Sequence, residues 1–133
     1  MIGVLLITHG AIGEALLSSA GQILGGPPAQ AAAIGVALGE EPDAVLARAR
    51  AAAARLDRGE GVLVLTDMFG ATPCNVAGRM LEDGRIEGVS GVSLPMLVRV
   101  LSRRQGSLAD AVVRARSGGT EGVVHINRDC CGA

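Results

Sequence analysis

The sequence contains no lysine, and all 12 of its cationic side chains are arginines. The missing amine excludes several chemistries in their usual form. A P-loop needs a lysine to reach the terminal phosphates of a nucleotide, a Schiff-base enzyme needs one as its nucleophile, and a receiver-type aspartate switch normally depends on one. The chain therefore carries out none of these reactions with the standard set of residues.

Aromatic residues are almost absent as well. Trp and Tyr do not occur, and Phe69 is the single phenylalanine. Charged residues make up 19% of the chain and nearly cancel, so that the formal net charge is −1. The protein thus offers neither a positive field for a phosphate backbone nor an aromatic platform for stacked bases. The composition predicts that nucleic acid is not a ligand.

Cysteine is scarce. Cys74, Cys130 and Cys131 are odd in number and two of them are adjacent, which is not the pattern of a disulfide framework. Cys130 and Cys131 beside His125 and Asp129 match no zinc pattern, because a zinc site usually needs two separated ligand pairs. No apolar run is long enough to cross a bilayer, and no basic segment precedes the apolar start of the chain. We expect a cytoplasmic protein without metal or cofactor.

The chain opens on an apolar run of strand length. Residues 2–7 read I-G-V-L-L-I and are followed by Thr8, His9 and Gly10. Such a run is typical of a parallel strand that helices cover on both faces. Ligands of open α/β sheets bind beyond the carboxyl ends of the strands, which is where this strand delivers its histidine. His9 is therefore the first candidate functional residue.

Helical and extended patterns alternate along the rest of the chain, which predicts one doubly wound α/β domain over residues 1–133. We expect Ser117-Gly118-Gly119 to end the last helix and the tail at 127–133 to be frayed. The predicted helices cover 12–24, 42–56, 73–81, 94–103 and 107–116, and the predicted further strands cover 31–38, 61–67, 86–92 and 122–126.

Two of the predicted strands end alike, one in Thr8-His9 and the other in Thr66-Asp67. In the flavodoxin-like strand order 2-1-3-4 these strands are neighbours, and the order reverses between them. His9 and Asp67 are then expected to meet in the crevice at the carboxyl edge of the sheet. A carboxylate that accepts a hydrogen bond from one imidazole nitrogen leaves the other nitrogen bare and nucleophilic.

The turn that follows Asp67 predicts an anion site. Residues 69–72, read as Phe69-Gly70-Ala71-Thr72, lead into a helix, where free backbone amides and the Thr72 hydroxyl can hold a phosphate. Gly10 removes a side chain where a reactant must approach His9. These features describe a histidine that carries a phosphoryl group. The sequence shows no magnesium ligand cluster or nucleotide loop, so we expect another protein to donate that group.

Structural roles compete with several of these interpretations. A histidine at a strand end is often a satisfied structural residue, an aspartate before a turn can simply cap it, and Thr-Pro is a common helix opening. His125 lies within the predicted last strand, which favours packing over chemistry. Cys74, in the first turn of a helix, is likewise favoured as a structural residue.

Three motifs stand in a specific order along the chain: I-T-H-G at 7–10, L-T-D-M-F-G-A-T-P-C-N at 65–75 and G-V-S-L-P-M-L at 91–97. Together they resemble the enzyme IIA domain of the mannose class of the bacterial phosphotransferase system, and this resemblance covers nearly the whole chain. It implies a phosphorylated His9 with Asp67 as its partner, and a phosphate held by residues 69–72. Thr66, Pro95 and Met96 are expected on the rim of the pocket, where a partner would meet the protein.

The resemblance also implies partners. A histidine phosphocarrier protein would be the donor, a IIB component would be the acceptor, and two chains would form a homodimer by exchanging the antiparallel strand expected at 122–126. Phe69 and Ala71 depart mildly from the Trp and Gly of the sugar-transport members, and Thr72 replaces their Ser. No IIB domain follows in the sequence, so a separate acceptor protein is expected.

Two roles remain open at this point. The protein is either a phosphohistidine carrier for sugar uptake or a regulatory module whose phosphorylation state controls a partner protein without transport. Phosphate on His9 would add charge to a nearly neutral surface, which is enough to alter docking. A hydrolase that uses the His–Asp pair is disfavoured, because no Ser or Cys nucleophile lies on an elbow-type turn.

Overall fold

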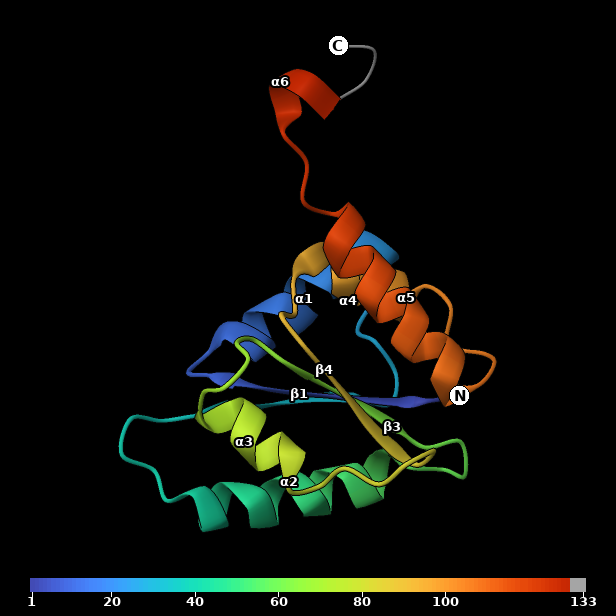
Figure 1. The fold of residues 1–133 in the computed structure, drawn as a ribbon. Coiled ribbons are helices and arrows are strands. Elements are labelled where there is room, and N and C mark those ends of the chain that lie inside the picture. The colour runs from blue at the N-terminus through green and yellow to red at the C-terminus, as the bar shows by residue number, and fades with distance from the viewer. Residues whose placement is uncertain (130–133) are drawn as a thin grey trace.

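The computed structural model of the protein describes residues 1–129. Its centre is a sheet of four parallel strands in the order β2-β1-β3-β4 (Figure 1). The predicted α/β fold and strand order are confirmed. The strands are β1 (Gly3–His9), β2 (Ala31–Val36), β3 (Val62–Thr66) and β4 (Ile86–Ser90).

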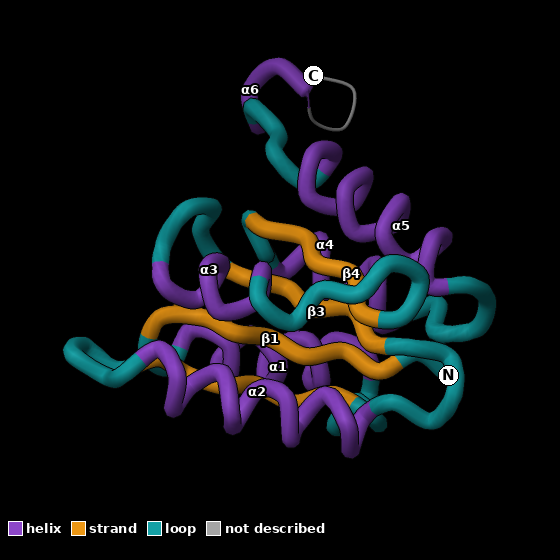
Figure 2. The backbone as a smooth tube through the Cα atoms, turned by 60° about the horizontal axis from the view of Figure 1, so that its bottom comes forward, coloured by secondary structure: helices purple, strands orange, loops and turns teal. Residues whose placement is uncertain are grey.

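Helices cover both faces of this sheet, α1, α4 and α5 on one and α2 and α3 on the other (Figure 1). A short sixth helix, α6, stands apart from the body of the molecule in both views (Figures 1 and 2). The helices are α1 (Ile12–Leu24), α2 (Pro42–Leu56), α3 (Thr72–Gly78), α4 (Leu94–Leu101), α5 (Leu108–Glu121) and α6 (Ile126–Asp129).

The strand β1 is the centre of the core because its side chains alternate between two hydrophobic clusters. Leu5 and Ile7 pack with α2 and α3, whereas Val4 and Leu6 pack with α1, α4 and α5. All four are 0% exposed. Burial of one such side chain contributes roughly 1.5–3 kcal/mol, so the strand that carries His9 is held firmly on both faces.

Most predicted boundaries lie within about two residues of those in the structure, and the ranges of α1 and α2 are confirmed. The helix predicted to reach residue 81 is wrong at its end, because α3 stops at Gly78. The amides of Arg79 and Met80 bond to carbonyls three residues earlier, on Val76 and Ala77. This tighter winding is typical of a helix that is ending.

The helix end predicted at Ser117-Gly118-Gly119 is wrong, since α5 continues to Glu121. A Cβ atom on Gly118 would lie 3.1 Å from the Arg99 Cβ and 3.2 Å from the Met96 Cα. The missing side chain lets α5 approach α4 closely at this position. Packing between the two helices therefore outweighs the low helix propensity of glycine.

The strand predicted at 122–126 is also wrong for the single chain. Residues 123–125 belong to no helix or strand, and α6 begins at Ile126. His125 is exposed instead of packed, and its amide donates to the Asp129 carboxylate at 2.8 Å. A strand needs a neighbouring strand for its backbone groups, and none pairs with this segment within residues 1–129. Part of the tail predicted to be frayed, residues 127–129, is helical, and Cys130 and Cys131 lie outside the described residues.

Candidate functional site

The parallel pairing of β1 with β3 brings His9 and Asp67 together at the carboxyl edge of the sheet. Ile7 of β1 is in register with Thr66 of β3, so the two strands end at about the same level of the sheet. The His9 Nδ1 lies 2.9 Å from the Asp67 Oδ2, and the His9 backbone amide donates to the same oxygen at 3.0 Å. One carboxylate oxygen thus holds both the ring and the main chain of the histidine.

The electrostatics of the pair assign the proton on the ring. Burial raises the pKa of the Asp67 carboxyl. The hydrogen bonds from the His9 amide, the His9 ring and the Asp67 backbone amide, with the attraction to the His9 ring in its protonated form, hold that pKa below its usual value. The carboxylate is therefore ionised at neutral pH and can only accept. The His9 Nδ1 donates to it, which leaves Nε2 with a free lone pair.

The two members of the pair differ in exposure. The side chain of His9 is 49% exposed, whereas that of Asp67 is 11% exposed. No hydrogen-bond partner for the His9 Nε2 is found within residues 1–129. The arrangement therefore presents a nucleophilic nitrogen to a reactant arriving from solvent, while the carboxylate that orients it stays behind the ring.

The turn from β1 into α1 shows why Gly10 is a glycine. Its φ of +47° lies in the left-handed region, and its amide donates to the Val36 carbonyl of β2 at 3.0 Å. A Cβ on Gly35 would lie 2.1 Å from the Gly10 carbonyl oxygen. Sequence reasoning missed Gly35, although an isolated glycine within a strand pattern is a signal of close backbone approach.

The loop after Asp67 leaves its amides free. Gly70 has a φ of +84°, and α3 begins at Thr72 with Ala71 as an extended N-cap that offers no side-chain acceptor. Within the described chain, the amides of residues 69–72 donate to no backbone acceptor. The loop that directly follows Asp67 in the chain therefore has unused backbone donors, and the anion site predicted there from the sequence stays a prediction. Phe69, which lies in this loop, is 84% exposed.

The three residues expected on the rim lie in different environments. Pro95 is exposed, but Met96 is 3% exposed and belongs to the core. Thr66 is also 3% exposed, and its Oγ1 has no hydrogen-bond partner in the structure. It lines a hollow of about 290 Å³ under the Phe69 loop, together with Ser90, whose hydroxyl is likewise unpartnered. Ser90 carried no signal in the sequence, because a serine at a strand end is common.

Exposed apolar side chains lie on two loops and at the start of α1, at the carboxyl edge of the sheet. We call these four residues the apolar collar: Ile12, Leu38, Met68 and Phe69, exposed by 46%, 106%, 59% and 84%. They follow β1, β2 and β3, the three strands nearest the histidine. All four therefore lie at the same edge of the sheet as His9.

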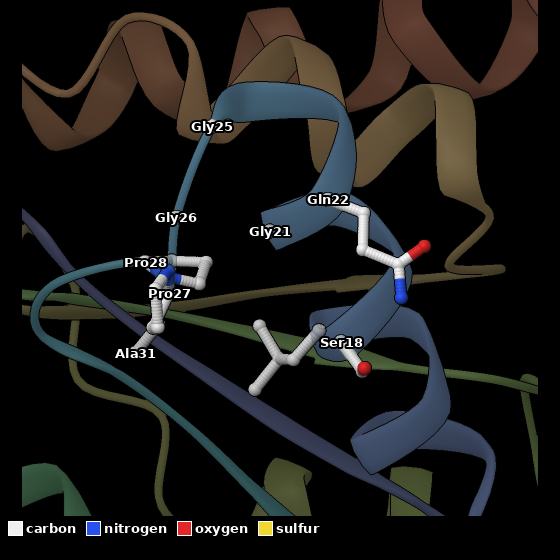
Figure 3. A pocket seen from close by; sticks show the side chains of 9 residues that line it. Ser18, Gly21, Gln22, Gly25, Gly26, Pro27, Pro28 and Ala31 are labelled. Atoms are coloured by element: carbon white, nitrogen blue, oxygen red, sulfur yellow. The ribbon is translucent and has the colours of Figure 1, made fainter.

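The apolar hollow beside α1 lies at the other edge of the sheet. It has a volume of about 640 Å³ and lies between the last turns of α1 and the loop Gly25–Pro28, with Ser18 and Gln22 as its polar side chains (Figure 3). The helix begins beside His9 and ends here, so the hollow and the His–Asp pair are at opposite ends of α1. Its lining carries no ionisable group that would support chemistry.

Two further observations apply to residues 1–129. No group of three or more His, Cys, Asp or Glu side chains is placed to hold a metal ion there. None of the helices in this part of the chain combines the length and the apolar character needed to cross a membrane.

A four-stranded parallel sheet in this order, with helices on both faces and a His–Asp pair at its carboxyl edge, defines an open α/β domain of the flavodoxin-like class. The chain belongs to the family described as PTS system fructose IIA component, whose model matches residues 3–116. It is thus a phosphotransferase system enzyme IIA domain of the mannose class.

The chain is 35% identical over 125 residues to the PTS system mannose-specific EIIAB component of Escherichia coli (strain K12), a match that covers 92% of this chain and 38% of that protein. It is also 35% identical over 106 residues to the PTS system fructose-specific EIIA component of Bacillus subtilis (strain 168), covering 79% of this chain and 72% of that one. The chain thus spans well under half the length of the first of these relatives.

Solved structures agree with the assignment. A phosphotransferase system component EIIA from Streptococcus agalactiae superimposes with a TM-score of 0.84 at 26% identity, covering 96% of this chain and 98% of that one. The mannose/sorbose specific IIA subunit from Enterococcus faecalis gives a TM-score of 0.83 at 25% identity and covers 94% of each chain.

The ionised Asp67 predicts a pH dependence of stability. Its folded pKa lies below the unfolded value of about 3.9, so the carboxylate stabilises the fold above that value and the contribution is lost as the pH falls through the folded pKa. We expect Asp67→Asn to show a shallower loss of stability than the wild type between about pH 5 and pH 3. Urea unfolding followed by circular dichroism measures this loss.

Asp83→Asn is the matched control, because Asp83 is exposed and forms no ion pair within the described part of the chain. Its pH profile should run parallel to that of the wild type. A profile for Asp67→Asn that also runs parallel to the wild type would contradict the assignment of an ionised, hydrogen-bonded carboxylate.

Proposed function

We propose that the protein is a phosphohistidine carrier that accepts a phosphoryl group on His9 from a histidine phosphocarrier protein and passes it to a separate IIB component during sugar uptake. The observation that carries this proposal is the shared Asp67 oxygen, which holds the His9 ring with its Nε2 free and facing solvent. The names of the relatives, which are components of phosphotransferase systems for mannose and fructose, support it.

The proposed transfer needs no group beyond those at the site. The Nε2 lone pair of His9 forms a bond to phosphorus in line with the bond to the donor nitrogen, and that nitrogen takes the electron pair as its bond breaks. Nδ1 keeps its proton, and the Asp67 carboxylate stabilises the positive charge that develops on the ring. The amides of residues 69–72 and the Thr72 hydroxyl then neutralise the phosphoryl oxygens.

The apolar collar supplies the docking surface for both partners in this proposal. Donor and acceptor must each bring a nitrogen to the same Nε2, so they bind the same edge of the sheet one after the other. Leu38 is fully exposed, and Phe69 is nearly so. Exposed apolar side chains around a reactive group provide contact area at its rim and exclude water when a partner covers them.

The same proposal includes a homodimer formed by exchange of the segment 122–126. β4 is an edge strand whose only neighbouring strand in the described chain is β3, apart from a single antiparallel bridge between Ile86 and Glu82. Hollows of about 650 and 290 Å³ are both lined by its residues 88–90. Val123 and Val124 are exposed by 84% and 47% on a segment with no neighbour of its own. An unpaired edge and an unpaired apolar segment complement each other between two copies.

Phosphorylation is tested with radiolabelled phosphoenolpyruvate, enzyme I and the phosphocarrier protein. The wild type should take up an acid-labile label, and His9→Ala should lose it entirely, because the nucleophilic nitrogen is gone. His125→Ala is the matched control, since His125 is the only other histidine and is exposed. Label on His9→Ala, or none on the wild type, would overturn the proposal.

The same reaction separates transport from regulation. Added IIB component should remove the label from the wild type if the protein feeds a transporter. Retention of the label in the presence of IIB components would instead favour a regulatory module whose phosphorylation state controls a partner protein.

Substitution in the collar tests docking. Leu38→Asp places a charge in the proposed interface and leaves the His–Asp pair untouched. We expect the KM for the phosphorylated donor to rise about 5- to 30-fold, which corresponds to about 1–2 kcal/mol of lost interface energy, with little change in kcat. Ile23→Asp is the control, because Ile23 is 58% exposed near the end of α1, away from the site. Equal KM values for the two variants would exclude the collar as the docking surface.

The dimer is tested by light scattering on the purified chain. The wild type should have the mass of two chains, and Val124→Asp should have the mass of one, because a charge cannot enter an apolar hollow beside β4 without cost. Ile23→Asp should remain a dimer. A monomeric wild type, or a dimeric Val124→Asp, would contradict exchange through this segment.

A further inference from the structure

The side chain of Thr8 joins the end of β1 to the start of α1. It is 0% exposed, directly before the histidine. Its Oγ1 accepts the Gly13 amide at 2.8 Å, and its hydroxyl donates to the His9 carbonyl at 3.3 Å. A single buried hydroxyl therefore connects two backbone groups, the His9 carbonyl and the Gly13 amide, across the turn that carries the imidazole ring.

This contact replaces a helix cap that the sequence does not provide. The N-cap residue of α1 is Ala11, whose side chain has no acceptor, so the first amides of the helix lack one. Thr8 satisfies the Gly13 amide from the strand instead. A Cβ on Gly13 would lie 3.1 Å from the Thr8 Oγ1 and 3.2 Å from the Ala33 Cβ, so the helix start can approach the strand because that residue is a glycine.

The turn at 9–11 is thus held at three points. Thr8 ties it to α1, the Gly10 amide ties it to Val36 of β2, and the His9 amide ties it to Asp67 beyond β3. The amide and the ring of His9 share one carboxylate oxygen. Any shift of the backbone at His9 therefore moves the ring away from its orienting partner as well.

We propose that Thr8 is a positioning residue for phosphoryl transfer: its hydroxyl fixes the turn so that both N–H groups of His9 meet the Asp67 Oδ2 and Nε2 points outward. This inference rests on the proposed function of His9. It differs from a purely structural role for Thr8, which would affect the stability of the fold and leave the ring and the rate of transfer unchanged.

Thr8→Val and Thr8→Ser separate the two roles. Valine keeps the shape but removes the hydroxyl, so the Gly13 amide loses its acceptor and the turn loses one of its three attachments. We expect kcat for labelling of His9 to fall about 10- to 100-fold with the KM for the donor unchanged, since a misplaced reacting group costs rate and not docking. Thr8→Ser keeps the hydroxyl and should restore most of kcat.

The tautomer of the His9 ring is a second measurement, and a purely structural role of Thr8 would leave it unchanged. In ¹⁵N spectra the wild-type His9 should show a proton held on Nδ1, and Thr8→Val should show a mixture of the two tautomers. His125 is the internal reference in the same spectrum, because its ring bonds to nothing described and should not change. Val45→Ala, a core variant on α2 with a comparable loss of stability, should keep both the wild-type kcat and the wild-type tautomer.

Gly35→Ala disturbs the same turn from β2, and it replaces Thr8→Val in these measurements if Thr8→Val does not fold. The added Cβ would lie 2.1 Å from the Gly10 carbonyl oxygen, so the turn must move, and we expect the same loss of kcat. Folded variants at Thr8 or Gly35 with the kcat and tautomer of Val45→Ala would overturn the inference while leaving the carrier function intact. A wild type that takes up no label would reject the carrier function itself.

Discussion

One carboxylate oxygen organises the functional edge of this protein. The Asp67 Oδ2 accepts both the ring and the amide of His9, and these bonds outweigh the cost of placing a charge at a site that is largely shielded from water. The parallel register of β1 and β3 makes the contact possible. Everything else at this edge, from the glycine turn to the free amides of the loop, is arranged around the histidine that this oxygen holds.

The scaffold holds the backbone under His9 firmly and leaves the His9 ring accessible from solvent. The strand under His9 is buried on both faces, whereas the ring and the apolar collar face solvent. The proposed carrier role needs this division, because the reactive atom would have to be held firmly while its surroundings stay open to a partner.

Sequence patterns predicted the structure correctly where its cause is local or periodic. The apolar run of β1, the helices α1 and α2, and the matching strand ends at His9 and Asp67 all follow from patterns of this kind. They failed at the C-terminal part of the chain. A Gly-Gly pair reads as a helix end, yet here it is the surface on which α5 packs against α4. The apolar segment after it has the pattern of a strand, yet no strand pairs with it in the part of the chain that the structure describes.

The residue types and their spacing thus determined the fold class, the family and the pairing of His9 with Asp67. The alternation of apolar side chains and the positions of the strand ends can be identified from the sequence alone. Only the tertiary structure decided which imidazole nitrogen is free, why Gly10 and Gly35 are glycines and that Thr8 caps a neighbouring helix. These depend on distances between segments far apart in the sequence, and such distances exist only once the core has packed.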